Sequence, residues 1–147
     1  MVEQLDQSEI ESFLVDANAG VLSLTDGTET YAIPESYGYD GECLYFQFVY
    51  SEDSQKMAFV EATEIATVTV FTENPTKSVV VRGRLELVPD ADQPQAAAAM
   101  ADNAEIPALN VLSETSPEDL SMTFYRLVPT EVSGRRFDGA VSESTGF

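Results

Sequence analysis

Apolar and polar residues alternate along much of the chain, which is the pattern of β-strands that have one covered face. This alternation predicts six or seven strands, with candidates over residues 21–25, 29–34, 43–50, 65–72, 77–88, 121–128 and 131–137. Asp26-Gly27 and Asp40-Gly41 separate the first three candidates. These pairs predict tight hairpin turns, because such turns need the positive φ that Gly and Asp tolerate. The pattern therefore predicts a mainly β protein with an antiparallel sheet.

Apolar residues at helical spacing and typical start signals mark the predicted helices. Asp6, with Glu9 three residues later, forms a capping-box pattern, and Ser54 is a favourable N-cap residue. Helices are predicted over 6–17, 54–62 and the alanine-rich segment 93–103, with a further helix start at 116–119. We expect these helices to flank the sheet.

The predicted strand 43–50 is apolar on both of its faces. One face carries Leu44, Phe46, Phe48 and Tyr50, and the other carries Cys43, Tyr45, Gln47 and Val49. In a small closed barrel, one face of such a strand fills the interior and the other meets a partner chain or a ligand. The chain has neither an internal repeat nor a linker, so we expect one domain over residues 1–147.

The excess of acidic over basic residues argues against negatively charged binding partners. The chain has 26 acidic and 7 basic residues, which give a net charge of −19. Such a surface repels nucleic acid and anionic membranes, so neither partner is expected. Because 44% of the residues are hydrophobic and the acids are scattered, the composition indicates a folded acidic protein. It resembles that of halophilic proteins, which work in a cytoplasm that holds molar salt.

Several kinds of catalytic site are disfavoured by composition. Histidine is absent and Cys43 is the only cysteine, which argues against serine–histidine, cysteine–histidine, zinc and histidine-ligated haem sites. We predict no metal site, and we expect Cys43 to be a buried, inert thiol. The first residues lack the basic and apolar regions of a secretory signal, so a cytoplasmic location is expected.

Several short stretches carry a resemblance through their order and spacing: 20–24, 31–34, 37–40, 44–46, 54–56 and 78–83. In this order they resemble the pyridoxamine-5′-phosphate-oxidase-like split-barrel family of flavin-binding proteins. The resemblance implies a six-stranded antiparallel split barrel with flanking helices. It also implies a homodimer whose interface forms two equivalent flavin sites, with FMN as the cofactor.

The resemblance implies a cofactor site whose phosphate lies at the start of the helix 54–62, where free amides favour an anion. The residues implied to hold the phosphate are Ser54, Gln55 and Lys56, and those implied to line the ring are Pro34, Glu35, Ser36, Gln47, Phe48 and Ser78. Gln55 stands where the family has an arginine, Gln47 replaces its usual histidine, and Phe48 replaces a hydroxyl residue.

Other roles remain open for some of these residues. Lys56 is also explained by surface pairing with Glu52 or Asp53, and the aromatic residues of 43–50 by filling the barrel or a dimer interface. Arg82 and Arg84 share one face of 77–88, where pairing with surface carboxylates is the simpler reading. The pair at 135–136 would complete a site in the other protomer.

The function that the resemblance implies is an FMN-dependent oxidoreductase, which passes electrons from a reduced nicotinamide to a small organic acceptor. No catalytic side chain is assigned, because the flavin itself handles hydride and proton. The chain lacks the tryptophan- and histidine-containing end of true pyridoxamine oxidases and is more similar to the flavin-reductase and nitroimidazole-resistance branch. The alternatives are a deazaflavin-binding reductase, a flavin store without turnover, and an empty structural dimer.

The acidic composition predicts that the fold depends on salt. Removing KCl from the molar range should lower the melting temperature steadily, because unscreened carboxylates repel one another. Circular dichroism recorded during heating across a KCl series measures this effect. An unchanged melting temperature at low salt would contradict the halophilic interpretation.

Overall fold

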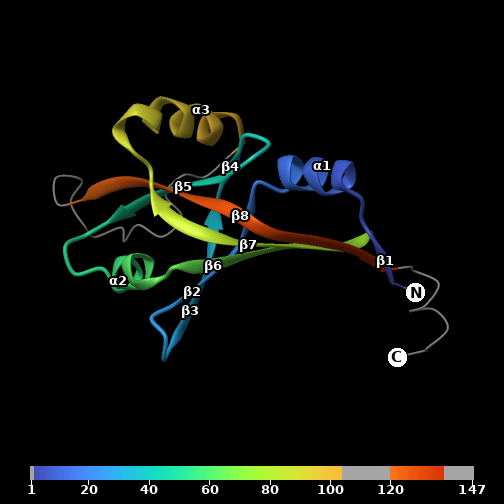
Figure 1. Cartoon of the computed structure of the whole chain (residues 1–147), viewed down its shortest axis with the longest axis horizontal. Coiled ribbons are helices and arrows are strands. Elements are labelled where there is room, and N and C mark those ends of the chain that lie inside the picture. The colour runs from blue at the N-terminus through green and yellow to red at the C-terminus, as the bar shows by residue number, and fades with distance from the viewer. Residues whose placement is uncertain (1, 104–119, 138–147) are drawn as a thin grey trace.

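The computed structural model describes residues 2–103 and 120–137 (Figure 1). The strands are β1 (Val2–Gln4), β2 (Ala19–Thr25), β3 (Thr30–Ser36), β4 (Gly38–Tyr39), β5 (Leu44–Tyr50), β6 (Ile65–Glu73), β7 (Thr76–Leu87) and β8 (Ser121–Phe137). The helices are α1 (Gln7–Ala17), α2 (Gln55–Ala62) and α3 (Gln93–Asn103), with a short 3₁₀ turn at Asp90–Asp92. None of these helices is long and apolar enough to cross a membrane.

All strands in the described ranges belong to one antiparallel sheet that curls into a half-barrel. Its order is β3-β2-β6-β7-β8-β5-β4, and β1 pairs with the end of β8. Within the described residues, β2, β3, β5, β6, β7 and β8 are the strands of seven residues or more, and β1 and β4 are short additions. This arrangement confirms the predicted mainly β split barrel with flanking helices.

One predicted boundary is wrong. The segments 121–128 and 131–137 form a single strand, β8, of 17 residues. Pro129 pairs with Gly83, and the register shifts between Arg82 and Gly83. Such an irregularity lets a strand accommodate a proline, which lacks the N–H that a regular ladder uses. The chain therefore continues through Pro129 without leaving the sheet.

The predicted local signals are confirmed where the structure describes them. Gly27 and Gly41 have φ of 100° and 95° in the two hairpins. Asp6 and Glu9 form the capping box of α1, and the side chain of Ser54 caps α2. The predicted helix start at 116–119 lies outside the described residues.

The side chains on one face of β5 fill the interior of the barrel. Leu44, Phe46 and Phe48 are completely buried and belong to the main core with Leu22, Leu24 and Leu127. Tyr45, on the opposite face, packs in a second cluster with Ala96, Ala99 and Met100 of α3. The expectation that this face meets a partner or a ligand is therefore wrong at Tyr45, because α3 covers it.

Cys43 lies at the edge of this second cluster and is half-buried. Burial raises the pKa of its thiol, so the reactive thiolate is disfavoured at neutral pH. This agrees with the predicted inert role.

The outer face of β6, β7 and β8 is not covered by any element of the described ranges. On β6, Ala66, Val68 and Val70 point into the core, whereas Ile65 and Phe71 are 49% and 61% exposed. Because side chains alternate along a strand, these two apolar residues belong to the outer face. Large exposed apolar residues on one sheet face are a feature of surfaces that bind another protein.

Candidate functional site

Three of the predicted site residues meet inside the barrel. Lys56 lies in the first turn of α2, Glu35 near the end of β3, and Phe48 on the inner face of β5. The Nζ of Lys56 donates to Oε1 of Glu35 at 3.1 Å and lies 5.1 Å from the centroid of the Phe48 ring. A buried cation is thus held between a carboxylate and an aromatic face.

The burial of Lys56 rules out one interpretation of this residue, which is surface pairing with a nearby carboxylate. Lys56 and Glu35 are 7% and 6% exposed, whereas Glu52 and Asp53 are exposed at the surface. The alternative that Lys56 pairs with Glu52 or Asp53 is therefore wrong. Its partner is Glu35, 21 residues earlier in the chain. Each buried charge is costly to desolvate alone, so each depends on the other.

The start of α2 is the polar end of this site. Ser54 Oγ accepts a hydrogen bond from the N–H of Met57, and the carbonyl of Ser54 accepts one from Ala58. The N–H groups of the first two helical residues, Gln55 and Lys56, have no intrahelical partner at this end. Gln55 is exposed. The amides and the partial positive charge of the helix are therefore available to an anion.

A cavity of about 440 Å³ and two others of about 270 and 600 Å³ open on the described part of the chain. The largest precedes α2 and is lined by Tyr50, Ser51, Glu52, Asp53 and Ser121. It has room for part of a cofactor next to the helix start. Its two carboxylates also make it acidic, which opposes an anion at low salt.

The remaining ring-lining candidates point in different directions. Phe48 is completely buried, stacked on Phe46 and tilted against Tyr125. Gln47 lies on the opposite face of β5, where its Nε2 donates to the sulfur of Met122. On β3, Pro34 is exposed while Ser36 is buried. Phe48 therefore lies beside Lys56, whereas Gln47 and the exposed Pro34 are not gathered around it.

Ser78 lies far from Lys56 within one chain. It is the third residue of β7, next to the end of β8, whereas α2 lies near the opposite end of β7 (Figure 1). It faces outward in a row with Phe71 and Arg135, its cross-strand neighbours. A cavity of about 270 Å³ covers this row and is lined by Ser78, Val80, Arg82, Glu131, Ser133 and Arg135.

The arginines divide into paired and unpaired groups. Arg82 contacts Glu131 at 3.8 Å and Arg84 contacts Glu86 at 3.3 Å, which confirms the expected pairing with carboxylates. Arg136 binds Glu3 and Glu9 and ties β1, α1 and β8 together. Within residues 2–103 and 120–137, Arg135 makes no salt bridge.

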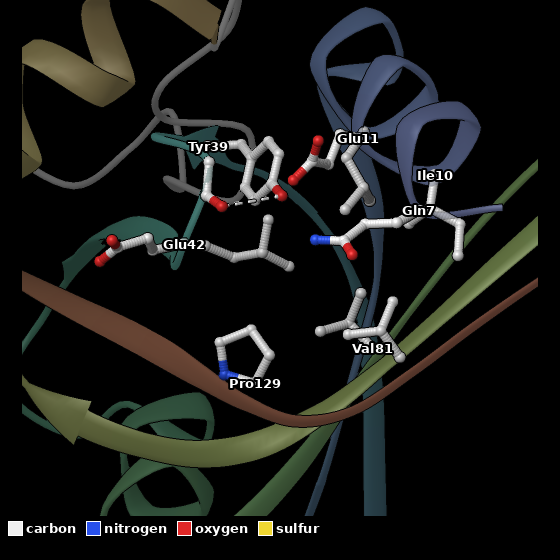
Figure 2. A pocket seen from close by; sticks show the side chains of 11 residues that line it. Gln7, Ile10, Glu11, Tyr39, Glu42, Val81 and Pro129 are labelled. Carbon is white, nitrogen blue, oxygen red and sulfur yellow. Dashed lines mark hydrogen bonds between the residues drawn. The ribbon is translucent and has the colours of Figure 1, made fainter.

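The cavity of about 440 Å³ between α1 and the β4–β5 hairpin was not predicted from the sequence (Figure 2). The available signal was the spacing of Gln7 and Glu11, which places two polar residues on one helix face beside Ile10 and Leu14.

Comparison with known proteins decides the family. The sequence profile described as Pyridoxamine 5′-phosphate oxidase matches residues 6–136. The chain belongs to this family. No curated protein sequence matches the chain.

Solved structures similar to this family member share its fold. An FAD-binding protein from Mesorhizobium loti is 25% identical, covering 94% of this chain and 99% of that one, with a TM-score of 0.70. A candidate 5-nitroimidazole antibiotic resistance protein from Bacteroides thetaiotaomicron is 18% identical over 93% and 88%, with a TM-score of 0.68. An FAD-binding protein from Mycobacterium smegmatis is 19% identical over 92% and 98%, with a TM-score of 0.64.

The buried ion pair predicts that Lys56 of this oxidase-family chain stabilises the fold. Replacing Lys56 with Met should lower the free energy of unfolding by about 3 kcal/mol, because the carboxylate of Glu35 stays buried without this cation. Urea denaturation in molar KCl measures the change. The double variant Glu35→Gln/Lys56→Met should lose less free energy of unfolding than Lys56→Met alone.

Lys77 provides the matched control, since it is the only other lysine, is half-buried, and makes no salt bridge in the described part of the chain. Lys77→Met should change the stability by no more than about 0.5 kcal/mol. Equal losses for the two lysine variants would contradict a specific role for the Lys56–Glu35 pair.

Proposed function

We propose that the protein binds FMN and is an oxidoreductase that passes electrons from a reduced nicotinamide to a small organic acceptor. The observation that carries the proposal is the start of α2, where a capped helix end, free amides and Lys56 come together. Membership of the pyridoxamine 5′-phosphate oxidase family supports it, as do similar structures described as FAD-binding proteins.

The residues at the start of α2 fit a phosphate. The ammonium of Lys56 has three N–H donors and donates one of them to Glu35. The other two can donate to a phosphate oxygen. The backbone N–H groups of Gln55 and Lys56 and the hydroxyl of Ser54 add to them. Gln55 supplies hydrogen bonds but no charge. When bound, a flavin supplies the hydride and electron transfer, while these residues bind and orient its phosphate.

A homodimer would complete the site. Ser78 and Arg135 lie on the outer face, away from Lys56, and Arg135 has no salt bridge to any residue that the structure describes. A ligand that touches Lys56 as well as Ser78 and Arg135 therefore needs two chains. The exposed apolar residues Ile65 and Phe71 on the same face support such an interface. In this arrangement one protomer provides the start of α2, and its partner provides the outer face.

The identity of the cofactor is part of the test. FAD carries the same isoalloxazine as FMN with an added nucleotide, and a deazaflavin coenzyme is the predicted alternative. Titrating all three into the protein and measuring thermal stabilisation ranks their affinities, because a ligand stabilises the state that binds it. We expect FMN to stabilise most. Binding without reduction by any nicotinamide would favour a flavin store over an enzyme.

FMN should bind saturably at one molecule per chain in molar KCl, measured by quenching of flavin fluorescence. The variant Gln55→Arg should bind FMN about tenfold more tightly, because a guanidinium adds a charge-assisted hydrogen bond to the phosphate. Ala58→Arg adds the same charge at an exposed position one turn further along α2 and is the control. The absence of flavin binding in the wild type would overturn the flavin proposal.

Light scattering in molar KCl should give twice the mass of one chain. Phe71→Lys should shift the protein toward the monomer and lower its flavin occupancy, because it places a charge on the proposed interface. Leu87→Lys is the matched control, since Leu87 is 56% exposed but has the register of the inner face. A monomeric wild type that still binds flavin would contradict the shared site.

A further inference from the structure

The cavity beside α1 is separate from the proposed flavin site. It lies between α1, the β4–β5 hairpin and the part of β8 that contains Pro129 and Val132, and its volume is about 440 Å³. Val81 and Val132, which pair across β7 and β8, line it from the inner face of the sheet. The volume lies within the range of small-molecule sites, roughly 300–1,000 Å³.

The walls of this cavity are apolar on the side of the sheet. Ile10 of α1 and Pro129 and Val132 of β8 provide its accessible surface, whereas Leu14, Leu44 and Val81 lie beneath it and are buried. Val132 remains 41% exposed although it has the register of the inner face, because the cavity opens over it. An apolar ligand body placed here would cover that surface and gain free energy from its burial.

The polar groups of the cavity gather on one side. In Figure 2 the amide of Gln7 and the carboxylate of Glu11 extend from α1 toward the ring of Tyr39, whereas the carboxylate of Glu42 points away from them. Neither Lys nor Arg lines the cavity, and Glu11 makes no salt bridge within the described ranges. Glu11 therefore presents an unneutralised carboxylate to any ligand.

The three polar groups can all act as hydrogen-bond acceptors. The hydroxyl of Tyr39 donates to the carbonyl of Gly41 at 3.3 Å, which leaves its oxygen free to accept. Burial, and then the nearby Glu11 carboxylate, raise the pKa of Tyr39, so this hydroxyl keeps its proton. The carbonyl oxygen of Gln7 and the carboxylate of Glu11 complete the set.

We propose that this cavity binds a small organic cation: a primary ammonium on an apolar body. An ammonium carries three N–H donors and one positive charge, which match three acceptors and one carboxylate. The apolar body would lie on the accessible surface of Ile10, Pro129 and Val132. An anionic ligand would face Glu11 without any basic side chain to compensate.

The absence of tryptophan makes an indole probe selective. Tryptamine, tryptophol and indole-3-acetate share one ring and differ in carrying an ammonium, a hydroxyl or a carboxylate. With excitation where tyrosine does not absorb, fluorescence anisotropy of each probe is titrated with the full chain in molar KCl. Tryptamine should bind with a Kd of about 1 mM or below, tryptophol more weakly, and indole-3-acetate not at all.

Variants of the cavity test where the probe binds. Glu11→Gln should weaken tryptamine about tenfold and leave tryptophol unchanged, because only the ammonium uses the charge. Asp16→Asn removes a carboxylate from an exposed position of the same helix and should leave both affinities unchanged. Val132→Phe fills the open part of the cavity and should abolish binding of both probes.

Three outcomes would overturn the proposal. They are the absence of saturable tryptamine binding, equal binding of indole-3-acetate, and unchanged tryptamine binding in both Glu11→Gln and Val132→Phe. Tryptamine would also fail to bind if a second copy of the chain filled the cavity. Light scattering on the same samples would identify that dimer. Because the cavity is separate from α2, flavin binding is expected to persist in Glu11→Gln, so the two proposals fail independently.

Discussion

Strand β8 is the element on which the sheet depends, because it pairs with β1, β7 and β5. A strand of 17 residues reaches all three partners by passing an irregularity opposite Arg82 and Gly83. A Cβ atom at Gly83 would clash with the carbonyl oxygen of Val128, so this close approach of two backbones requires glycine. Beyond it, alternating residues of β8 serve two surfaces: Val132 lines the cavity beside α1, and Ser133 and Arg135 face outward.

The Lys56–Glu35 pair changes what a phosphate would meet at the start of α2. Because the ammonium is already neutralised by a carboxylate 3.1 Å away, an incoming dianion meets a dipole rather than a bare cation. The backbone N–H groups of the helix start would then carry more of the interaction than the lysine does. Gln55 adds no positive charge. In the proposed dimer, the guanidinium of Arg135 from the second chain would supply that charge to the phosphate. The proposed dimer would therefore add a positive charge to the site as well as complete its shape.

What the sequence predicted well was local. The caps at Asp6 and Ser54 and the glycine turns at Gly27 and Gly41 depend on residues within four positions of one another, and the structure contains all of them. The alternation along the long strands predicted an antiparallel sheet, and the resemblance, which spans most of the chain, implied that this sheet is a split barrel. The continuity of β8 was not predictable, because a proline such as Pro129 usually indicates a strand end. Its irregular pairing with Gly83 is visible only in the structure.

The candidate site was harder to predict because its contacts are long-range. Lys56 and Glu35 were each assigned to a flavin site, yet nothing in the sequence indicated that they bind each other across 21 positions. Likewise, the alternation along β5 did not reveal that α3 covers Tyr45. The cavity beside α1 combines residues from α1, the β4–β5 hairpin, β7 and β8, which lie far apart in the sequence.

The acidity of the chain acts on the two proposed sites in opposite directions. A net charge of −19 repels a flavin phosphate and attracts an ammonium whenever salt does not screen it. At molar ionic strength the screening length is about 3 Å, so only groups in direct contact with the ligand still contribute. Under those conditions the α2 amides and Lys56 decide phosphate binding, and Glu11 decides ammonium binding. The ligand preference of each site is therefore set by a few contacts, and the distant carboxylates affect it only when salt is low.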